Sequence, residues 1–374
     1  MNNNLKVGNL FGIPFLINPS WFLVFGLVTL SYGGSLSSFP ELNGVMPWLL
    51  GLVTALLLFS SVLAHELGHS VVAISQGIKV NSITLFIFGG LASLEKESEK
   101  PWQQFLIAIA GPAVSLVLWA VLMVTGFTVA MPGPISGILF SIATVNLFLG
   151  LFNLIPGLPL DGGNIVKALV WQITGNRNQG TIFASRAGQV VGGAAIAVGL
   201  LGILNILPLG NFWTLLVGWF ILQNAGASAQ SAQVQETLTQ YTAQDAVIKD
   251  SPIVAGDLNL REFANNYIIG QKPWQKYLVV DANQTLLGAI EVKDLKAIPT
   301  TTWPEITVQA LTKPVPETSL ITANQTLLQV AERLETMNLK ELAVISEDNI
   351  LLGLLEKPAI ISLLKEKYKL ANQA

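Results

Sequence analysis

Long stretches without a charged residue alternate with short polar segments over the first 230 positions of this 374-residue chain. About 20 consecutive apolar residues are enough for a helix to cross a bilayer. The apolar stretches lie near residues 19–32, 47–75, 102–128, 135–154, 188–207 and 212–224. They predict a polytopic α-helical membrane protein with about six transmembrane helices. The last stretch is short, so we expect it to be tilted or extended by its flanks.

One apolar stretch has the pattern of strands rather than of a spanning helix. Ile83–Phe88 is rich in strand-forming residues and too short to span as a helix, and Gly89-Gly90 separates it from Leu91–Leu94. We predict a small membrane-associated β-hairpin or sheet here. A buried apolar connector is the alternative interpretation.

A second irregular segment follows the fourth predicted span. Between Asn153 and Gly163 the chain has two prolines and three glycines, which stop a regular helix. Irregular backbone at membrane depth is tolerated where it is buried in protein or lines a wet cavity. Asp161 lies at the end of this segment, so we expect it at such a cavity.

The polar remainder of the chain contains an internal repeat. Tyr277–Glu291 aligns without a gap on Leu342–Glu356, and each copy reads as strand, polar turn and strand. Each copy also has an amphipathic helix before it and a helix after it, which predicts a soluble duplicated α/β module. The predicted domains are a transmembrane domain at 1–226, a linker at 227–243, and the two copies at 244–300 and 310–370.

Composition supports the membrane assignment and excludes several chemistries. Hydrophobic residues make up 51% of the chain and charged residues 11%, against about 25% charged in soluble proteins. The absence of cysteine excludes disulfides, thiolate ligands and a cysteine nucleophile. A net charge of −3 without a basic, aromatic-rich patch gives no indication of nucleic-acid binding.

Charge placement predicts an orientation. The lysines and arginines before residue 240 fall at the N-terminus or in alternate connectors, at Lys6, Lys79, Lys96, Lys100, Lys167, Arg177 and Arg186. The positive-inside rule then places both termini and the duplicated module in the cytoplasm. The second and fourth spans would run in the same direction, so their later ends would reach the same depth.

The second span carries the candidate chemistry. His65 and His69 are the only histidines, and four residues apart on a helix they lie on one face and can bind one metal ion. Glu66 is placed to take a proton from a metal-bound water. Asp161, at comparable depth, is a candidate third ligand, and two histidines with one carboxylate leave a fourth zinc position open. The alternative is a chance match in an apolar helix.

These motifs resemble those of the site-two proteases, which are intramembrane zinc metalloproteases. His65–His69 matches the first family motif, and Asn153–Gly163 matches Asn-x-x-Pro-x-x-Pro-Leu-Asp-Gly-Gly, the second. Phe88–Ala92 and Ala110–Pro112 are also similar to family features, and the resemblance covers about residues 1–226.

The resemblance implies one Zn²⁺ held by His65, His69 and Asp161, with Glu66 as general base and later as proton donor to the leaving amine. It implies a lipid-embedded enzyme, in the plasma membrane, that cleaves the transmembrane segment of a single-span protein in regulated intramembrane proteolysis. A substrate helix must unwind locally, and the predicted hairpin could accept it by edge pairing. Asn153 is a candidate for steadying the substrate or the developing oxyanion, and Asn146 is the alternative.

The duplicated module resembles a pair of cystathionine-β-synthase (CBS) domains, which implies regulation through an adenine nucleotide. Nucleotide sites of that family often carry Gly-x-x-Ser/Thr-x-x-Asp. The first copy keeps Gly288 and Asp294 but has Glu291 at the hydroxyl position, and the second copy has Glu356 there and no aspartate. Dimerisation of two chains, or docking of another protein, is therefore an alternative role.

Two other classes of function compete with a protease. A CBS-regulated transporter or channel predicts polar residues distributed along a pore, whereas the polar groups here converge on one depth. A catalytically inactive scaffold would not need an intact set of His65, Glu66, His69 and Asp161.

Overall fold

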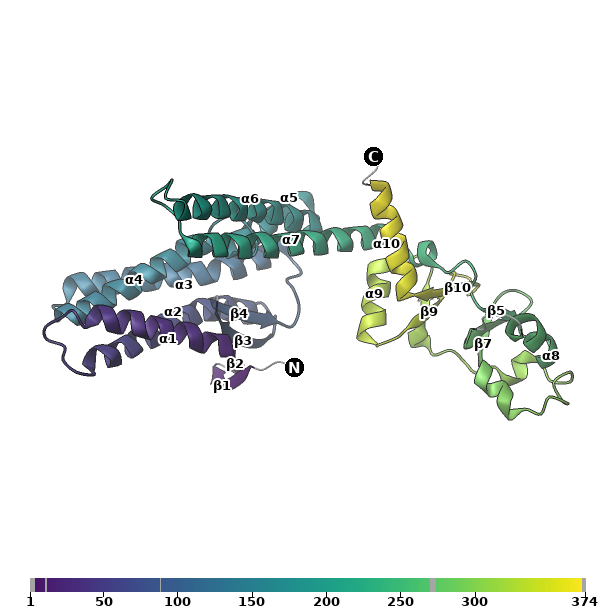
Figure 1. The fold of residues 1–374 in the computed structure, drawn as a ribbon. Helices are drawn as coiled ribbons and strands as arrows, with labels where there is room; N and C mark the ends of the chain where they lie inside the picture. The colour runs from purple at the N-terminus through teal and green to yellow at the C-terminus, as the bar shows by residue number, and fades with distance from the viewer. Residues whose placement is uncertain (1–3, 11, 88, 270–273, 372–374) are drawn as a thin grey trace. The chain divides into compact units, whose positions relative to one another are not determined.

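The computed structural model describes residues 4–10, 12–87, 89–269 and 274–371 (Figure 1). The chain divides into two compact units, Met1–Ala232 and Gln233–Ala374. The first unit carries the predicted spans and the second carries the internal repeat, so each is described by itself.

The first unit is built mainly from helices, and each predicted apolar stretch overlaps one of them, although the stretches at 135–154 and 188–207 run past the helix ends at Asn153 and Ile203. The helices are α1 (Pro19–Leu36), α2 (Met46–Ser75), α3 (Pro101–Thr128), α4 (Gly133–Asn153), α5 (Asp161–Thr174), α6 (Arg177–Ile203) and α7 (Phe212–Gln240). Helix α5 was not predicted, because its sequence reads as a polar connector. It ends where Gly175 adopts the left-handed conformation, a common helix stop.

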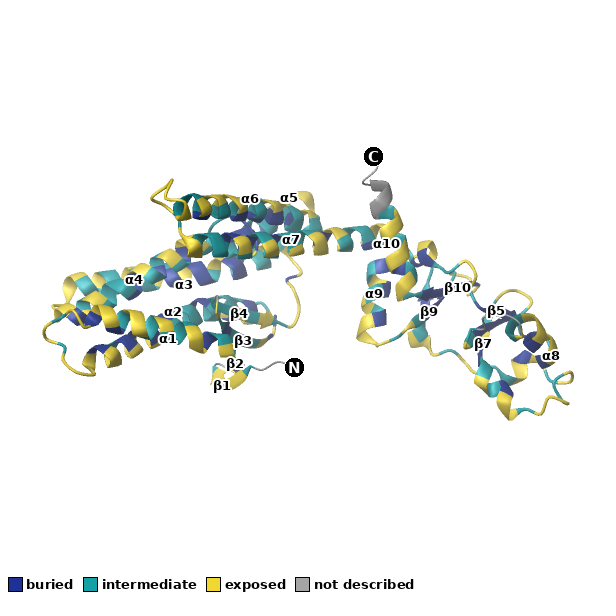
Figure 2. Ribbon diagram, viewed as in Figure 1, coloured by how far each residue is buried: buried dark blue, intermediate teal, exposed yellow. Residues whose placement is uncertain are grey.

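Among the described residues, four helices, α2, α3, α4 and α6, are long and apolar enough to cross a membrane. In the most apolar 18-residue segment of each of these helices, at most a third is buried within the protein. Large apolar side chains cover the outside of this unit, and Figure 2 shows exposed positions along all of these helices. Such a surface is stable only against lipid or another protein, so the chain is an integral membrane protein. Helices α1 and α7 fall outside the four, and a count of six spans stays a prediction.

The predicted hairpin belongs to a larger sheet. Strands β3 (Val80–Phe86) and β4 (Gly89–Leu94) pair antiparallel, and β3 also pairs in parallel with β2 (Ile13–Ile17), which pairs with β1 (Leu5–Leu10). The order is β1-β2-β3-β4, so β4 is an edge strand. Phe88, in the predicted first strand, lies outside the described residues.

The N-terminal hairpin of this sheet was missed because Leu5–Ile17 was read as a polar end followed by a span. Ile13 and Ile83 are almost fully buried together with Ala73 of α2. The sheet is thereby held against the later half of α2, the part that carries the histidines.

Helix α7 continues as far as Gln240, through most of the predicted linker. The second unit follows with β5 (Ile253–Ala255), α8 (Leu260–Phe263), β6 (Lys276–Val280), β7 (Leu286–Glu291), β8 (Leu320–Thr322), α9 (Leu327–Thr336), β9 (Glu341–Ile345), β10 (Leu351–Glu356) and α10 (Lys357–Ala371). Its two sheets, β5-β6-β7 and β10-β9-β8, have the same pairing pattern.

The two copies of the sequence repeat share the same unusual backbone angles at equivalent positions. Gln284 and Asn349, 65 positions apart, both have positive φ, of 64° and 60°. Gly288 and Gly353 have φ of 156° and 148°. One prediction differs: the helix expected directly after the strands of the first copy is a 3₁₀ helix, Val292–Ala297.

Candidate active site

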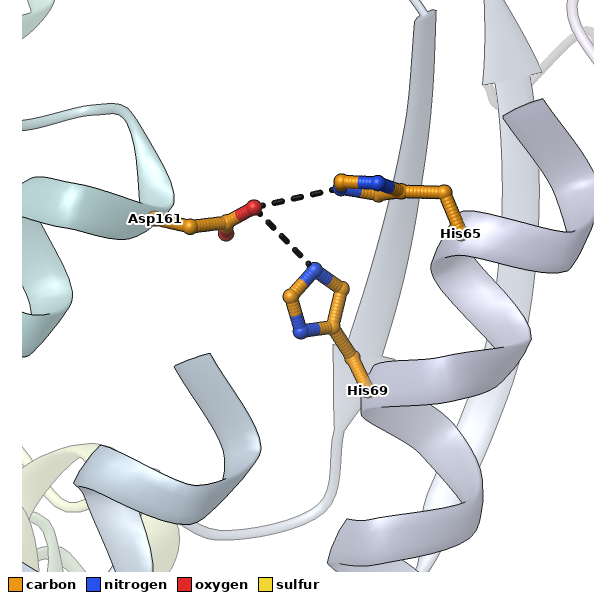
Figure 3. A group of neighbouring side chains, drawn as sticks. All are labelled: His65, His69 and Asp161. Carbon is orange, nitrogen blue, oxygen red and sulfur yellow. Dashed lines mark hydrogen bonds and ion pairs between the residues drawn. The ribbon is translucent and has the colours of Figure 1, made fainter. Parts of the chain in front are cut away.

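The imidazoles of His65 and His69 on α2 lie beside the carboxylate of Asp161, the first residue of α5. The Nε2 atoms of His65 and His69 lie 3.1 and 3.3 Å from Oδ2 of Asp161 (Figure 3). His65 is 3% exposed, and the side chains of His69 and Asp161 are largely buried. The helical spacing of the histidines and the irregular segment 154–160 before α5 produce this meeting.

The donor set fits a zinc ion. The ligand atoms of His65, His69 and Asp161 all lie within 4.8 Å of one another, a spacing that one ion can bridge. Two imidazole nitrogens and a carboxylate are ligands that zinc accepts, and three protein ligands are typical of catalytic zinc sites.

Each imidazole is oriented by helix α3. Nδ1 of His69 lies 2.6 Å from the carbonyl oxygen of Ile107, and because a carbonyl only accepts, Nδ1 carries the proton. The lone pair of His69 is then on Nε2, the atom that faces Asp161. Nδ1 of His65 lies 2.9 Å from the hydroxyl of Ser115, which is fully buried. Outer hydrogen bonds of this kind fix the tautomer and angle of metal-binding histidines.

Close packing of α2 and α3 depends on two glycines. A Cβ on Gly111 would lie 2.2 Å from Nε2 of His69 and 2.8 Å from Nε2 of His65. A Cβ on Gly68, between the two histidines, would lie 2.9 Å from the carbonyl oxygen of Ala110. The residues Ala110–Pro112 therefore form the wall of the site, which explains why a glycine is needed there.

A cavity of about 630 Å³ opens beside these groups. His65, Glu66, His69 and Asp161 line it together with Gly89–Ala92 of the edge strand β4. A Cβ on Gly90 would lie 2.9 Å from Oε1 of Glu66, so the strand backbone and the carboxylate are adjacent. The cavity thus places a candidate base, a candidate metal site and the edge strand β4 around one space.

The structure separates the two candidate amides. Asn153 lines the cavity, and its Nδ2 donates one hydrogen bond, to the carbonyl of Leu149 at 2.9 Å. Asn146 is fully buried, and its Nδ2 donates to both Ser61 Oγ and the Ile142 carbonyl. A side-chain amide has two N–H donors. Counting partners among the described residues, Asn153 therefore has a donor left for a ligand and Asn146 has none.

Sequence reasoning found Asp161 of α5 and Ala110–Pro112 of α3 but missed the other contributions of these two helices. Ser115 and the Ile107 carbonyl were not singled out, although a serine one turn after Gly111 in an apolar span was a signal that it bonds something. Lys167 of α5 also lines the cavity, and its spacing gave no signal of this, because a residue six positions after Asp161 does not lie on the same face of the helix.

Asp294, the candidate nucleotide residue of the second unit, is engaged with a lysine. Its Oδ1 accepts a hydrogen bond from Lys313 Nζ at 2.8 Å, and this bond lowers the pKa of the Asp294 carboxyl. Glu291 is paired with Lys293. The acidic groups that would face a nucleotide are thus partly neutralised by neighbouring lysines.

Comparisons with known proteins agree with the chemistry of the first unit. The model of peptidase family M50 matches residues 53–136 and 128–192. A protein of Synechocystis named as a zinc metalloprotease is 58% identical over 365 residues, covering 98% of this chain and 96% of its own. The structure of a site-2 protease from Methanocaldococcus jannaschii, at 29% identity and a TM-score of 0.44, covers 60% of this chain and 95% of its own. A CBS-domain protein of Bacillus anthracis, at 18% identity and a TM-score of 0.29, covers 36% and 99%.

Proposed function

Because this chain belongs to peptidase family M50, the site-2 protease family of membrane zinc metalloproteases, we propose that it cleaves the transmembrane segment of a single-span membrane protein. The observation that carries the proposal is the convergence of His65, His69, Asp161 and Glu66 on one cavity. The helices around this cavity have an apolar exterior, which would place it within the membrane, where the transmembrane segment of a substrate lies.

His65, His69 and Asp161 would hold the zinc ion, and Glu66 would act as the general base. Bound zinc supplies Lewis-acid chemistry, lowering the pKa of a coordinated water and polarising a carbonyl. Glu66 takes the proton of the attacking water and passes it to the leaving amine. A positioned base of this kind contributes about 10²- to 10⁴-fold to rate.

The edge strand β4 is the proposed platform for the substrate. A helix hides its amide bonds, so the substrate must unwind near the scissile bond. The unwound segment can hydrogen-bond to a free strand edge as an added strand, and Gly89–Ala92 of β4 present such an edge in the cavity. This arrangement would place the substrate backbone beside Glu66.

Asn153 is the proposed oxyanion donor. Its second amide N–H is free of the Leu149 bond and the residue lines the cavity. A donor of this type stabilises the negative charge that develops on the carbonyl oxygen. Asn146, whose donors are both used within the helices, takes a structural role instead.

The second unit is proposed to regulate activity or assembly. Two sheets with one pairing pattern fit a tandem CBS pair, which implies an adenine nucleotide or a homodimer. The pairing of Asp294 Oδ1 with Lys313 favours assembly over nucleotide binding, because a ribose hydroxyl would have to compete with this lysine for the carboxylate. The positions of lysine and arginine favour an orientation with both termini and this unit in the cytoplasm, and the plasma membrane is the proposed location.

The test is cleavage of a co-reconstituted single-span reporter by wild-type protein and by Glu66→Gln, with bound zinc counted in both. We expect wild type to cleave, and Glu66→Gln to retain zinc but lose at least about 100-fold in rate. Isothermal titration with AMP and with ATP, and mass measurement in detergent, separate the two roles proposed for the second unit.

Two outcomes would contradict the protease proposal. If wild type and Glu66→Gln hold zinc and cleave equally, Glu66 is not the base. If neither variant holds zinc, the metal site proposed at His65, His69 and Asp161 is wrong.

A further inference from the structure

The cavity has a second set of polar lining residues besides the histidines, Glu66 and Asp161. Glu97, Ser98, Gln104, Asn164 and Lys167 line it, and we call this group the polar end. Gln104 donates to Asn164 Oδ1 at 3.2 Å, which joins α3 to α5. None of these five residues has a role in the reaction as proposed above.

Lys167 is a buried cation with little to satisfy it. Its side chain is 12% exposed, and burial lowers the pKa of its amine. Its nearest acidic partner, Glu97 Oε2, lies 4.0 Å from Nζ, beyond hydrogen-bond range. Among the described residues, the Lys167 ammonium makes no hydrogen bond, although it has three N–H donors.

Glu97 is held mainly by another residue. Its carboxylate contacts Arg177 at the start of α6, and its side chain is 71% exposed. Arg177 in turn lies over the ring of Trp171, 5.5 Å from the ring centre. Glu97 therefore does not close off Lys167 from the cavity.

Ser98 gives an independent sign that the polar end receives a ligand. It is 2% exposed, lines the cavity, and within the described part of the chain its hydroxyl has no hydrogen-bond partner. Buried polar groups are normally satisfied. The Ser98 hydroxyl and the Lys167 ammonium are both buried, line the same cavity and lack a hydrogen-bond acceptor among the described residues. A ligand from outside the chain would supply that acceptor.

We propose that the polar end is a specificity subsite in which Lys167 binds an acidic side chain of the substrate. The inference rests on the proposed protease function. Six residues of α5 separate Lys167 from Asp161, which is about 9 Å along a helix. An extended substrate advances about 3.3 Å per residue. The acidic side chain therefore sits about two to three residues from the scissile bond, on the side that runs along α5.

The experiment uses the full chain in liposomes and a set of single-span reporters. The parent reporter is cleaved first and the scissile bond is located by mass spectrometry. Each of the three positions on either side of that bond is then changed to Glu, Gln or Lys. For wild type we expect about a 10-fold higher kcat/KM for Glu than for Gln at one or two adjacent positions, on one side only.

Charge reversal supplies the decisive comparison. Lys167→Glu should keep cleaving the neutral reporter and should favour the Lys reporter over the Glu reporter at the same positions. Lys167→Met should treat all three reporters alike. Lys79→Met is the matched control, because Lys79 is exposed, lies 3.9 Å from Glu95 and does not line the cavity. It should keep the wild-type preference.

The outcomes distinguish this inference from the protease function. If wild type cleaves the parent reporter but shows no charge preference, or if Lys167→Glu keeps the wild-type preference, the subsite is wrong and the protease proposal stands. If wild type does not cleave the parent reporter, the protease proposal fails and the subsite fails with it.

Discussion

Gly111 allows the imidazoles of His65 and His69 to occupy the space beside α3. A Cβ there would lie 2.2 Å from Nε2 of His69, so Gly111→Ala must displace a ligand. Overpacking of this kind costs about 1–3 kcal/mol, which corresponds to about 5- to 150-fold in zinc affinity. We expect zinc affinity to fall by this factor, measured by competition with a chelating dye.

Gly137→Ala is the matched control for this change. Gly137 is also a helical glycine in an apolar helix, and a Cβ there meets nothing within 4 Å. Zinc affinity should be unchanged. Equal zinc affinity in Gly111→Ala and wild type would contradict the close packing of Gly111 against the two imidazoles.

Ser115 acts through His65 and is a positioning residue. Its hydroxyl lies 2.9 Å from Nδ1 of His65, and loss of such an outer bond lowers metal affinity about 10- to 100-fold. We expect Ser115→Ala to show that loss and Ser115→Thr to restore most of it. Ser60→Ala, which removes a hydroxyl bonded only to its own helix, should bind zinc as wild type does.

At the scale of single residues, the sequence predicted the candidate catalytic and metal-binding side chains better than the side chains that position them. His65, Glu66, His69 and Asp161 stand out because ionisable groups are rare and costly in an apolar span. Ser115 did not, because serine in a span most often bonds its own helix, as Ser60 and Ser70 do. The periodicity of the sequence does not show which helix packs beside α2, because that depends on tertiary structure.

Helix α6 supports the irregular segment that delivers Asp161. Gly188 packs on this segment so closely that a Cβ would lie 2.1 Å from the carbonyl oxygen of Leu158. Gly188→Ala should therefore lower the thermal midpoint of the first unit and weaken zinc binding together, because the segment must shift. Gly193→Ala, one turn away with open space around it, should change neither. A fall in stability without loss of zinc would show that Asp161 is positioned independently of α6.

Elements were predictable where one signal dominated. The apolar runs of α2, α3 and α4 predict helices by length alone. Helix α5 and the hairpin β1–β2 were missed because their amphipathic patterns are short and lie beside stronger signals. In the second unit the repeat predicted the paired strands, but the helix expected after β7 is 3₁₀, because Pro299 shortly afterwards limits its length.

At the scale of the whole molecule, the contrast in charge between the two halves predicted two kinds of unit, and the chain divides at Ala232. The sequence could not predict that α7 continues through most of the linker, because Ala and Gln are good helix formers as well as common linker residues. The charge pattern predicts that there are two units, whereas the exact boundary between them depends on where the packing of each unit ends.

This division predicts that removal of zinc affects one unit only. A ligand present at about 1,000 times its dissociation constant stabilises the state that binds it by about 4 kcal/mol. All three proposed ligands belong to the first unit. Hydrogen exchange of the full chain, with and without EDTA, should therefore show lower protection in peptides of α2 and α5 and none of this change in peptides of β6 and β9. The double variant His65→Ala/His69→Ala should not respond to EDTA at all. An equal loss of protection in β6 and β9 would mean that zinc binds elsewhere or that the two units unfold together, whereas a response confined to α2 and α5 would locate the metal and establish that the duplicated unit is stable without it.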